Sequence, residues 1–217
     1  MRKLLIDGDI ICYQMGFSAD KRGLTEQGAL DYVKTFIHDM VEYLGADDFD
    51  IYLTGADNFR IEVAKTAPYK GQRSGDRPTH YQAIRDYLIE KLEAEVVDGE
   101  EADDALGKNQ TKDTVLCSTD KDLDQIPGLH YNWRKNQVYE ITKEYGRMFF
   151  LKQMLTGDTA DNIIGIKGVG VKKAEKALKG LSYQEGLAKV REMYESAFGD
   201  AAESRLKENA QLLWIRR

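Results

Sequence analysis

Residues 114–122 read Thr-Val-Leu-Cys-Ser-Thr-Asp-Lys-Asp and form the clearest buried-strand pattern in the chain. A short apolar run without polar alternation is typical of a strand that is covered on both faces. The run is followed at once by two acids, Asp120 and Asp122. In open parallel sheets, ligands bind beyond the carboxyl ends of the strands, so acids at this position indicate a ligand site.

Two other apolar runs also lead to an aspartate. Leu4–Ile6 precede Asp7, and residues 51–54 precede Asp57. Apolar residues at helical spacing separate the runs, in 28–44, 81–92 and 101–108. Strands that alternate with helices predict an α/β fold with a mainly parallel sheet flanked by helices on both faces. Such a sheet would gather Asp7, Asp57 and Asp120 at one edge.

The rest of the chain divides into a loop, further strands and a helical region. Residues 60–80 are polar and basic and contain prolines and glycines, which predicts a loop. Residues 95–97 predict a strand and residues 130–141 a hairpin, and helical patterns dominate from residue 147 onward. We therefore expect an α/β core in residues 1–145 and a helical region in residues 146–217.

Composition restricts the class of protein. The 217 residues are 42% apolar and 31% charged, as in folded globular proteins, and no apolar run approaches the ~20 residues that span a bilayer. The N-terminal residues become acidic too early for a secretory signal. Cys12 and Cys117 lie in apolar runs without metal-ligand spacing. We expect a cytoplasmic protein with reduced, buried cysteines.

Acidic residues are also concentrated in two other segments. Glu101, Asp103 and Asp104 fall on one helical turn, and Asp158 and Asp161 are three residues apart. Like charges this close repel one another unless cations neutralise them. Carboxylates without histidine or cysteine suit hard ions such as Mg²⁺ or Mn²⁺. The predicted metal ligands are therefore Asp7, Asp57, Glu101, Asp103, Asp104, Asp120, Asp122, Asp158 and Asp161.

Each aspartate taken alone has an ordinary alternative interpretation. Aspartate is common in turns and at helix N-termini, and we keep this interpretation for Asp9 and Asp124. The net charge of −6 also argues against a nucleic-acid partner at first sight. Setting the nine predicted ligands aside leaves 28 of the 37 acids against 31 basic residues. That balance fits an acidic metal site within a mildly basic surface, and an ordinary acidic protein is the alternative.

Residues 163–174, Ile-Ile-Gly-Ile-Lys-Gly-Val-Gly-Val-Lys-Lys-Ala, resemble a helix-hairpin-helix segment. Glycines permit a close backbone approach, and the exposed N–H groups of the next helix bind phosphate oxygens without reading the base sequence. The predicted DNA contacts here are Gly165, Lys167, Gly168, Gly170, Lys172 and Lys173. The alternative is a plain glycine-rich connection between helices.

Taken together, these motifs resemble the 5′-nuclease family, which comprises flap endonucleases and 5′→3′ exonucleases. The resemblance extends from Leu4 to about Leu178 and is greatest to the short exonucleases of tailed phages. It rests mainly on residues 101–104, residues 118–122 and the segment from Gly157 through Gly170.

The resemblance implies two Mg²⁺ or Mn²⁺ ions and a K⁺ ion at the hairpin. One divalent site would use Asp7, Asp57, Glu101, Asp103 and Asp104, and the other Asp120, Asp122, Asp158 and Asp161. Residues 60–98 would form the arch over a 5′ end, with Lys70 and Arg73 as catalytic cations and Arg60 and Tyr69 as DNA contacts. The resemblance further implies a monomer that acts on DNA 5′ ends or flaps and has no membrane partner. It also implies an RNase H-like activity on RNA–DNA hybrids.

Three other functions fit parts of the sequence. Asp7-Gly8-Asp9 after a strand matches the nucleophile motif of haloacid-dehalogenase-type phosphatases, which need neither the hairpin nor the acids of residues 101–104. A DNA-end-binding protein without catalysis would have little reason to keep costly buried acids. A PIN-type ribonuclease would usually lack the glycine-rich hairpin.

Overall fold

The computed structural model describes residues 2–73 and 75–217 and contains two compact units. The sheet unit comprises Met1–Asp57, Gly75–Ile141 and Arg216–Arg217, and the helical unit comprises Asn58–Ser74 and Thr142–Ile215. The boundary after Ile141 lies close to the one expected after residue 145. The segment from residue 58 to 74 was expected in the core but groups with the helical unit.

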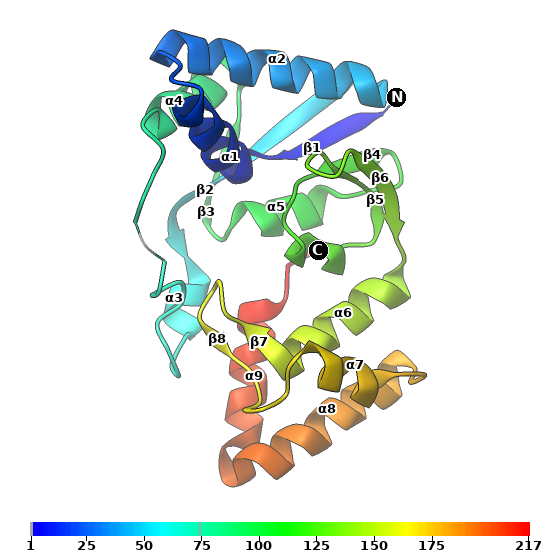
Figure 1. Ribbon diagram of the computed structural model, residues 1–217. Coiled ribbons are helices and arrows are strands. Elements are labelled where there is room, and N and C mark those ends of the chain that lie inside the picture. Colours follow the sequence, from blue (N-terminus) through cyan, green and yellow to red (C-terminus); the bar gives the residue numbers. More distant parts are fainter. Residues whose placement is uncertain (1, 74) are drawn as a thin grey trace. The chain divides into compact units, whose positions relative to one another are not determined.

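The sheet unit is built on six strands in the order β3-β2-β1-β4-β5-β6 (Figure 1). Strand β1 pairs in parallel with both β2 and β4, β4 pairs in parallel with β5, and the β5–β6 hairpin at one edge is antiparallel. This confirms the predicted mainly parallel sheet. The strands are β1 (Lys3–Asp7), β2 (Asp48–Asn58), β3 (Glu95–Gly99), β4 (Thr114–Cys117), β5 (Gly128–Asn132) and β6 (Gln137–Ile141).

Helices cover both faces of this sheet. Helices α1 (Gly8–Lys21), α2 (Glu26–Leu44) and α4 (Tyr81–Leu92) pack over one face, while α5 (Ala102–Asn109) contacts β1 from the other (Figure 1). A 3₁₀ turn, η1 (Asp122–Gln125), follows β4. Helix α1 begins directly after β1 and was not anticipated from the sequence.

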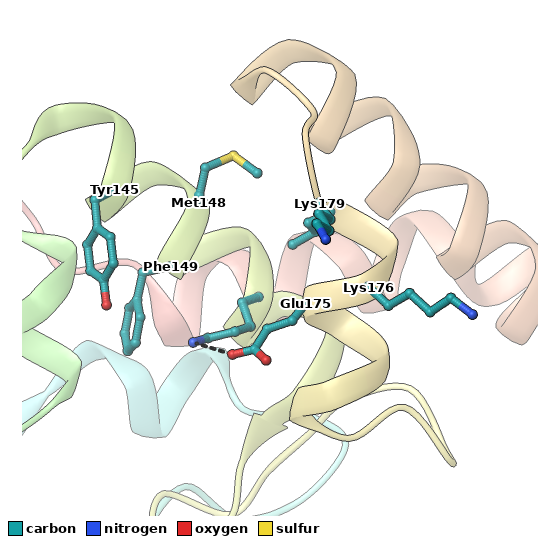
Figure 2. A pocket seen from close by; sticks show the side chains of 8 residues that line it. Tyr145, Met148, Phe149, Glu175, Lys176 and Lys179 are labelled. Carbon is teal, nitrogen blue, oxygen red and sulfur yellow. Dashed lines mark ion pairs between the residues drawn. The ribbon is translucent and has the colours of Figure 1, made fainter.

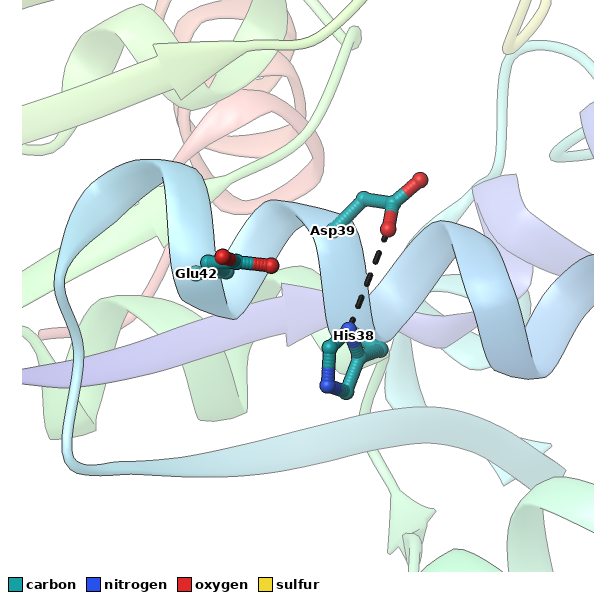
Figure 3. A group of neighbouring side chains, drawn as sticks. All are labelled: His38, Asp39 and Glu42. Atoms are coloured by element: carbon teal, nitrogen blue, oxygen red, sulfur yellow. Dashed lines mark ion pairs between the residues drawn. The ribbon is translucent and has the colours of Figure 1, made fainter.

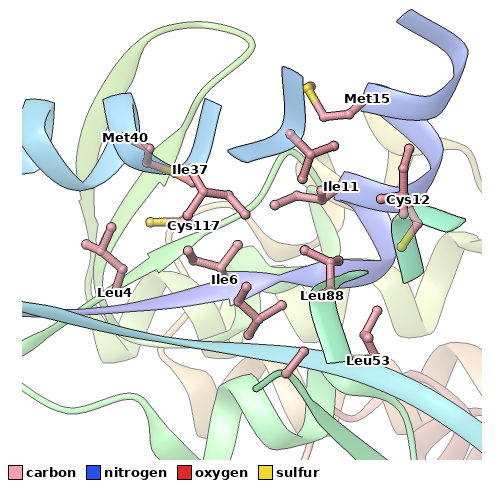
Figure 4. Close-up of a cluster of buried hydrophobic side chains, with 14 of the residues drawn as sticks. Leu4, Ile6, Ile11, Cys12, Met15, Ile37, Met40, Leu53, Leu88 and Cys117 are labelled. Carbon is pink, nitrogen blue, oxygen red and sulfur yellow. The ribbon is translucent and has the colours of Figure 1, made fainter. Parts of the chain in front are cut away.

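The core under α1, α2 and α4 explains why the strands read as continuous apolar runs. Leu4 and Ile6 of β1 point into this core, where they meet Ile11 and Ile37 (Figure 4). Leu5, between them, is also buried, so β1 is covered on both faces. Burial of each such side chain contributes about 1.5–3 kcal/mol. Both cysteines are buried and unbridged, as expected.

The helical unit consists mainly of four helices around a second core. Tyr194 is fully enclosed there, donates a hydrogen bond to the carbonyl of Met154 (2.6 Å) and accepts one from Asn209 (2.8 Å). The elements are α3 (Phe59–Val63), α6 (Lys143–Thr156), the short hairpin of β7 (Gly157–Asp158) and β8 (Ile163–Ile164), α7 (Val171–Leu178), α8 (Tyr183–Phe198), η2 (Gly199–Ala201) and α9 (Ala202–Leu213).

Side-chain contacts explain why residues 58–74 belong to the helical unit. The guanidinium of Arg60 donates hydrogen bonds to the carbonyls of Leu212 (2.9 Å) and Trp214 (3.0 Å), at the end of α9. The carboxylate of Glu208 on α9 accepts hydrogen bonds from the N–H groups of Lys65 and Thr66.

None of the described helices is long and apolar enough to cross a lipid bilayer.

Candidate metal and nucleic-acid sites

Three of the predicted metal ligands lie at or near the carboxyl ends of strands in the sheet unit. Asp7 is the last residue of β1, Asp57 lies one residue before the end of β2, and Asp120 follows β4 by three residues. Because β1 lies between β2 and β4 and pairs in parallel with each, the carboxyl ends of the three strands point in the same direction. Strand β2 continues past Tyr52, the register partner of Asp7, so Asp57 lies further out than Asp7. Asp7 is buried, Asp120 is half-buried and Asp57 is exposed.

Asp7 is held by two hydrogen bonds. Its Oδ1 accepts the N–H of Ile10 at the start of α1 (3.0 Å), and its Oδ2 accepts the hydroxyl of Ser118 (2.7 Å). Burial, followed by the negative charge of Asp9, raises the pKa of Asp7 to about 7, although both hydrogen bonds act in the opposite direction. The charge of Asp120 is a smaller contribution in the same direction. Asp7 is therefore a buried carboxyl group with two negatively charged neighbours.

The turn after β4 orders the next two acids. The N–H of Asp120 donates to Ser118 Oγ (3.0 Å), and Asp120 Oδ1 accepts the N–H of Asp122 (2.8 Å). Asp122 begins η1, and its carboxylate lies 3.4 Å from the ammonium of Lys121. Ser118, which sequence reasoning did not select, thus connects Asp7 with Asp120.

The three acids at the start of α5 have different surroundings. Asp104 is completely buried, and its two oxygens accept the N–H groups of Glu101 (3.2 Å) and Arg216 (2.9 Å). Glu101, the N-cap, is 6% exposed and forms a capping box with Asp104. Asp103 is half-buried. Asp104 was predicted as a metal ligand, and in this structure its two oxygens hold the start of α5 and the backbone of Arg216.

In the helical unit, Asp158 is the last residue of β7, and Asp161 lies in the connection between β7 and β8. Asp158 is 6% exposed, and its Oδ1 accepts the N–H groups of Ala160 (2.7 Å) and Asp161 (3.3 Å). Asp161 accepts the hydroxyl of Tyr69 (2.8 Å) on one oxygen and pairs with Arg73 (2.6 Å) through the other. The backbone N–H of Lys70 donates to the carbonyl of Asp161 (2.9 Å).

These contacts bring the guanidinium of Arg73 and the backbone of Lys70 beside one predicted ligand, while the Lys70 ammonium lies 5.1 Å from the centre of the Tyr69 ring. Lys70 and Arg73 belong to a segment that is fastened to Asp161 by backbone and side chain. Tyr69, predicted as a DNA contact, uses its hydroxyl for Asp161 instead. Arg60 is only 2% exposed, so its burial argues against the predicted contact with DNA.

The glycine-rich segment surrounds a cavity of about 430 Å³ that residues Asp158, Asn162 and Gly165–Gly170 help to line. A Cβ on Gly165 would lie 2.3 Å from the backbone nitrogen of Gly157, so only glycine fits there. Gly168 has φ 78°, which favours glycine for a different reason.

Helix α7 begins at the end of this segment. No side chain caps its N-terminus, and its first turn contains Lys172 and Lys173 but no acid. Both lysines are exposed, and Lys173 Nζ donates to the carbonyl of Gly168 (2.7 Å). Uncapped N–H groups next to lysines attract an anion rather than a cation.

Two other features lie apart from these residues. A groove of about 520 Å³ between α6 and α7 has an apolar floor that includes Phe149, and an ion pair between Lys152 and Glu175 (3.6 Å) crosses its edge (Figure 2). None of the predicted site residues lines it.

His38, Asp39 and Glu42 lie together on the exposed face of α2, with ligand atoms within 4.8 Å of one another (Figure 3). Within the described part of the sheet unit, the predicted carboxylates form no group this tight. Exposed charged side chains at this spacing on a helix are ordinary solvated surface.

Comparisons with known proteins agree with the expected resemblance. The thermostable DNA polymerase I of Thermus caldophilus is 28% identical over 213 residues, which cover 87% of this chain and 25% of the polymerase. The DNA polymerase I of Caldicellulosiruptor bescii is 26% identical over 85% of this chain. The chain thus spans about a quarter of the length of these relatives. No protein-family model matches the sequence.

Solved structures share the fold at low sequence identity. The T5 5′-exonuclease with bound zinc ions superposes with a TM-score of 0.63 at 16% identity, covering 99% of this chain and 100% of that one. The bacteriophage T5 flap endonuclease in complex with DNA and metal ions gives 0.62 at 16% identity, over 98% and 99%. The catalytic core of Rad2 with a DNA substrate gives 0.50 at 14% identity, over 96% and 72%. The fold expected from the resemblance is confirmed.

Proposed function

We propose that this chain is a divalent-metal-dependent 5′-nuclease that hydrolyses phosphodiester bonds at DNA 5′ ends and flaps. The observation that carries the proposal is the acidic edge, where Asp7 ends β1, Asp57 lies near the end of β2 and Asp120 follows β4. The resemblance in fold to the T5 5′-exonuclease and flap endonuclease, whose structures contain bound metal ions and, for the flap endonuclease, DNA, supports it.

The donor set fits hard divalent cations. All candidate ligands are carboxylates, which suit such ions. Burial is the main reason that the pKa of Asp7 is raised, and the negative charges of Asp9 and Asp120, which a bound cation would offset, raise it as well. In the sheet unit, Asp7, Glu101 and Asp103 are the strongest candidates, joined by Asp57, Asp120 and Asp122, with Asp104 fixing α5. In the helical unit, Asp158 and Asp161 are candidates. Bound Mg²⁺ or Mn²⁺ would supply an activated water and stabilise charge on the reacting phosphate.

Lys70 and Arg73 would supply positive charge to the scissile phosphate. The Arg73 side chain is 53% exposed, so phosphate approaches it from solvent while the ion pair with Asp161 keeps it in place. The hydroxyl of Tyr69 would then hold the carboxylate of Asp161 by a hydrogen bond and would not contact DNA.

The segment Gly165–Lys173 would hold the DNA backbone without reading its sequence. The uncapped start of α7 offers N–H donors, and Lys172 adds positive charge. A K⁺ ion is part of the expected hairpin. Here Lys173 Nζ already donates to the carbonyl of Gly168, so this ammonium supplies positive charge at the loop.

The phosphatase alternative loses support from the surroundings of Asp9. In that mechanism the second aspartate of Asp7-Gly8-Asp9 acts on the leaving group. Asp9 instead accepts the N–H of Thr54 (3.1 Å) and pairs with Arg85 (3.4 Å). A carboxylate held in an ion pair is a poor proton donor.

A time course on 5′-labelled substrates tests the proposal. Duplex DNA, a 5′ flap and an RNA–DNA hybrid are incubated with Mg²⁺, with and without EDTA. We expect short labelled products from the duplex or flap, and none in EDTA. Cleavage of the hybrid would add the RNase H-like activity. Absence of cleavage with both Mg²⁺ and Mn²⁺, together with phosphate release from a phosphomonoester, would support the phosphatase instead.

A further inference from the structure

Strand β2 extends beyond the end of β1. The last residue of β1, Asp7, pairs with Tyr52, so within the described residues β1 pairs with no residue of β2 from 53 onward. The backbone N–H of Thr54 donates to Asp9 Oδ2 (3.1 Å), and its carbonyl accepts a hydrogen bond from the Arg85 guanidinium (2.7 Å). Two side chains thus take the place of the missing strand, because buried backbone groups need partners.

Asp9 and Arg85 come from different helices and are paired with one another. Asp9 is on α1 and Arg85 on α4, and Arg85 Nη1 lies 3.4 Å from Asp9 Oδ1. Their side chains are 28% and 15% exposed. Gly8 allows this approach, since a Cβ there would lie 2.8 Å from the carbonyl oxygen of Tyr52.

The side chain of Thr54 connects this part of β2 with the start of α5. Its Oγ1 accepts the backbone N–H of Ala102 (3.0 Å), the first residue of the helix. This N–H is one of the donors that a helix start leaves unpaired. The neighbours of Ala102 are Glu101 and Asp103, two of the candidate metal ligands.

We propose that Arg85 and Asp9 are positioning residues that act through Thr54 on the start of α5 and so hold Glu101 and Asp103 in place for a divalent ion. This inference rests on the proposed nuclease function. Residues that orient metal ligands without touching the ion commonly contribute about 10- to 100-fold to metal affinity or activity.

Two pairs of variants in the full chain test the inference. Arg85→Ala removes the contact with the Thr54 carbonyl, and Arg85→Lys keeps a charge beside Asp9. Thr54→Val removes the hydroxyl and keeps the branched shape, and Thr54→Ser keeps the hydroxyl. Arg22→Ala is the charge-matched control, because Arg22 packs over Tyr32 in the same unit, away from this network.

Three measurements separate positioning from general stability: Mn²⁺ binding by electron paramagnetic resonance, the melting temperature, and kcat and KM on a 5′ flap. We expect Arg85→Ala and Thr54→Val to weaken Mn²⁺ binding by about 10- to 100-fold and to lower kcat with little change in KM. Thr54→Ser should recover most of the loss, Arg85→Lys part of it, and Arg22→Ala should match the wild type.

The inference is overturned if Arg85→Ala and Thr54→Val bind Mn²⁺ and turn over like the wild type, even with a lowered melting temperature. A wild-type chain that neither binds Mn²⁺ nor cuts would contradict the proposed function itself.

Discussion

The hydroxyl of Ser118 donates a 2.7 Å hydrogen bond to the buried carboxylate of Asp7 and so joins the ends of two adjacent parallel strands. The same oxygen accepts the N–H of Asp120. One small side chain therefore sets the spacing between two candidate metal ligands that are 113 residues apart in the sequence. A contact of this kind connects the topology of the sheet with the chemistry proposed for its edge.

The first prediction concerns Ser118→Ala, which leaves Asp7 and the Asp120 N–H without this partner. We expect a loss of about 1–3 kcal/mol in the free energy of unfolding and a cleavage rate lowered by about 10- to 100-fold. Ser182→Ala is the control, since this N-cap of α8 should cost about 1 kcal/mol without slowing cleavage. Equal cleavage rates in the two variants would remove Ser118 from the site.

The glycine-rich segment should hold DNA by its charge. Replacing Lys172 and Lys173 with alanine should weaken binding equally across DNA sequences and reduce the slope of log affinity against log salt by up to ~2. The single-turnover rate at saturating enzyme should change much less. The control is the double alanine variant of Lys176 and Lys179, two lysines that are also exposed and that follow the glycine-rich segment in the sequence. An unchanged salt slope in the first variant would make the segment a structural connection.

Lys70 is expected to act on the reacting phosphate. Lys70→Ala should lower the single-turnover cleavage rate by about 100- to 1,000-fold and leave DNA affinity nearly unchanged. Lys65→Ala is the matched control, because Lys65 is an exposed lysine in the same segment. If both variants cleave at the wild-type rate, the positive charge for the phosphate comes from elsewhere.

Glu208 should make the helical unit sensitive to acid. Burial alone would raise the pKa of Glu208, but hydrogen bonds from Thr66 and the N–H of Lys65, with the charge of Arg205, lower it overall. A carboxyl whose folded pKa is lowered adds stability above its unfolded pKa of about 4.3 and loses it as pH falls through the folded value. Thermal melting of Glu208→Gln should therefore show destabilisation at pH 7 that shrinks below about pH 4. A difference in melting temperature between the wild type and Glu208→Gln that is independent of pH would contradict this prediction.

Much of the fold was accessible from the sequence because buried parallel strands are continuous apolar runs with a sharp end. That pattern located β1, β2 and β4 and the aspartates that follow them. The hairpin of β5 and β6 was also expected, and Asn136 adopts the positive φ (48°) of its turn.

Other features have no local signature. Arg60 follows a strand in a polar stretch, and nothing nearby reveals that its partners are the carbonyls of Leu212 and Trp214. The same holds for Ser118 and Arg85, whose importance comes from contacts across the fold. Asp104 looked equivalent to Asp103, but one residue along a helix changes the direction of a side chain by about 100°, which here buries it.

We propose that the acids at the sheet edge bind divalent ions and that these ions are required for DNA cleavage. The most direct test is single-turnover cleavage of a 5′-labelled flap by Asp120→Asn and Asp103→Asn, with Asp124→Asn as control because Asp124 accepts a hydrogen bond from Tyr139. We predict that wild-type cleavage requires Mg²⁺ or Mn²⁺ and stops in EDTA, and that Asp124→Asn stays near the wild-type rate. Asp120→Asn and Asp103→Asn should be slower by several orders of magnitude, while melting in metal-free buffer is unchanged or higher. Near-normal cleavage by both variants, or full activity in EDTA, would contradict the account.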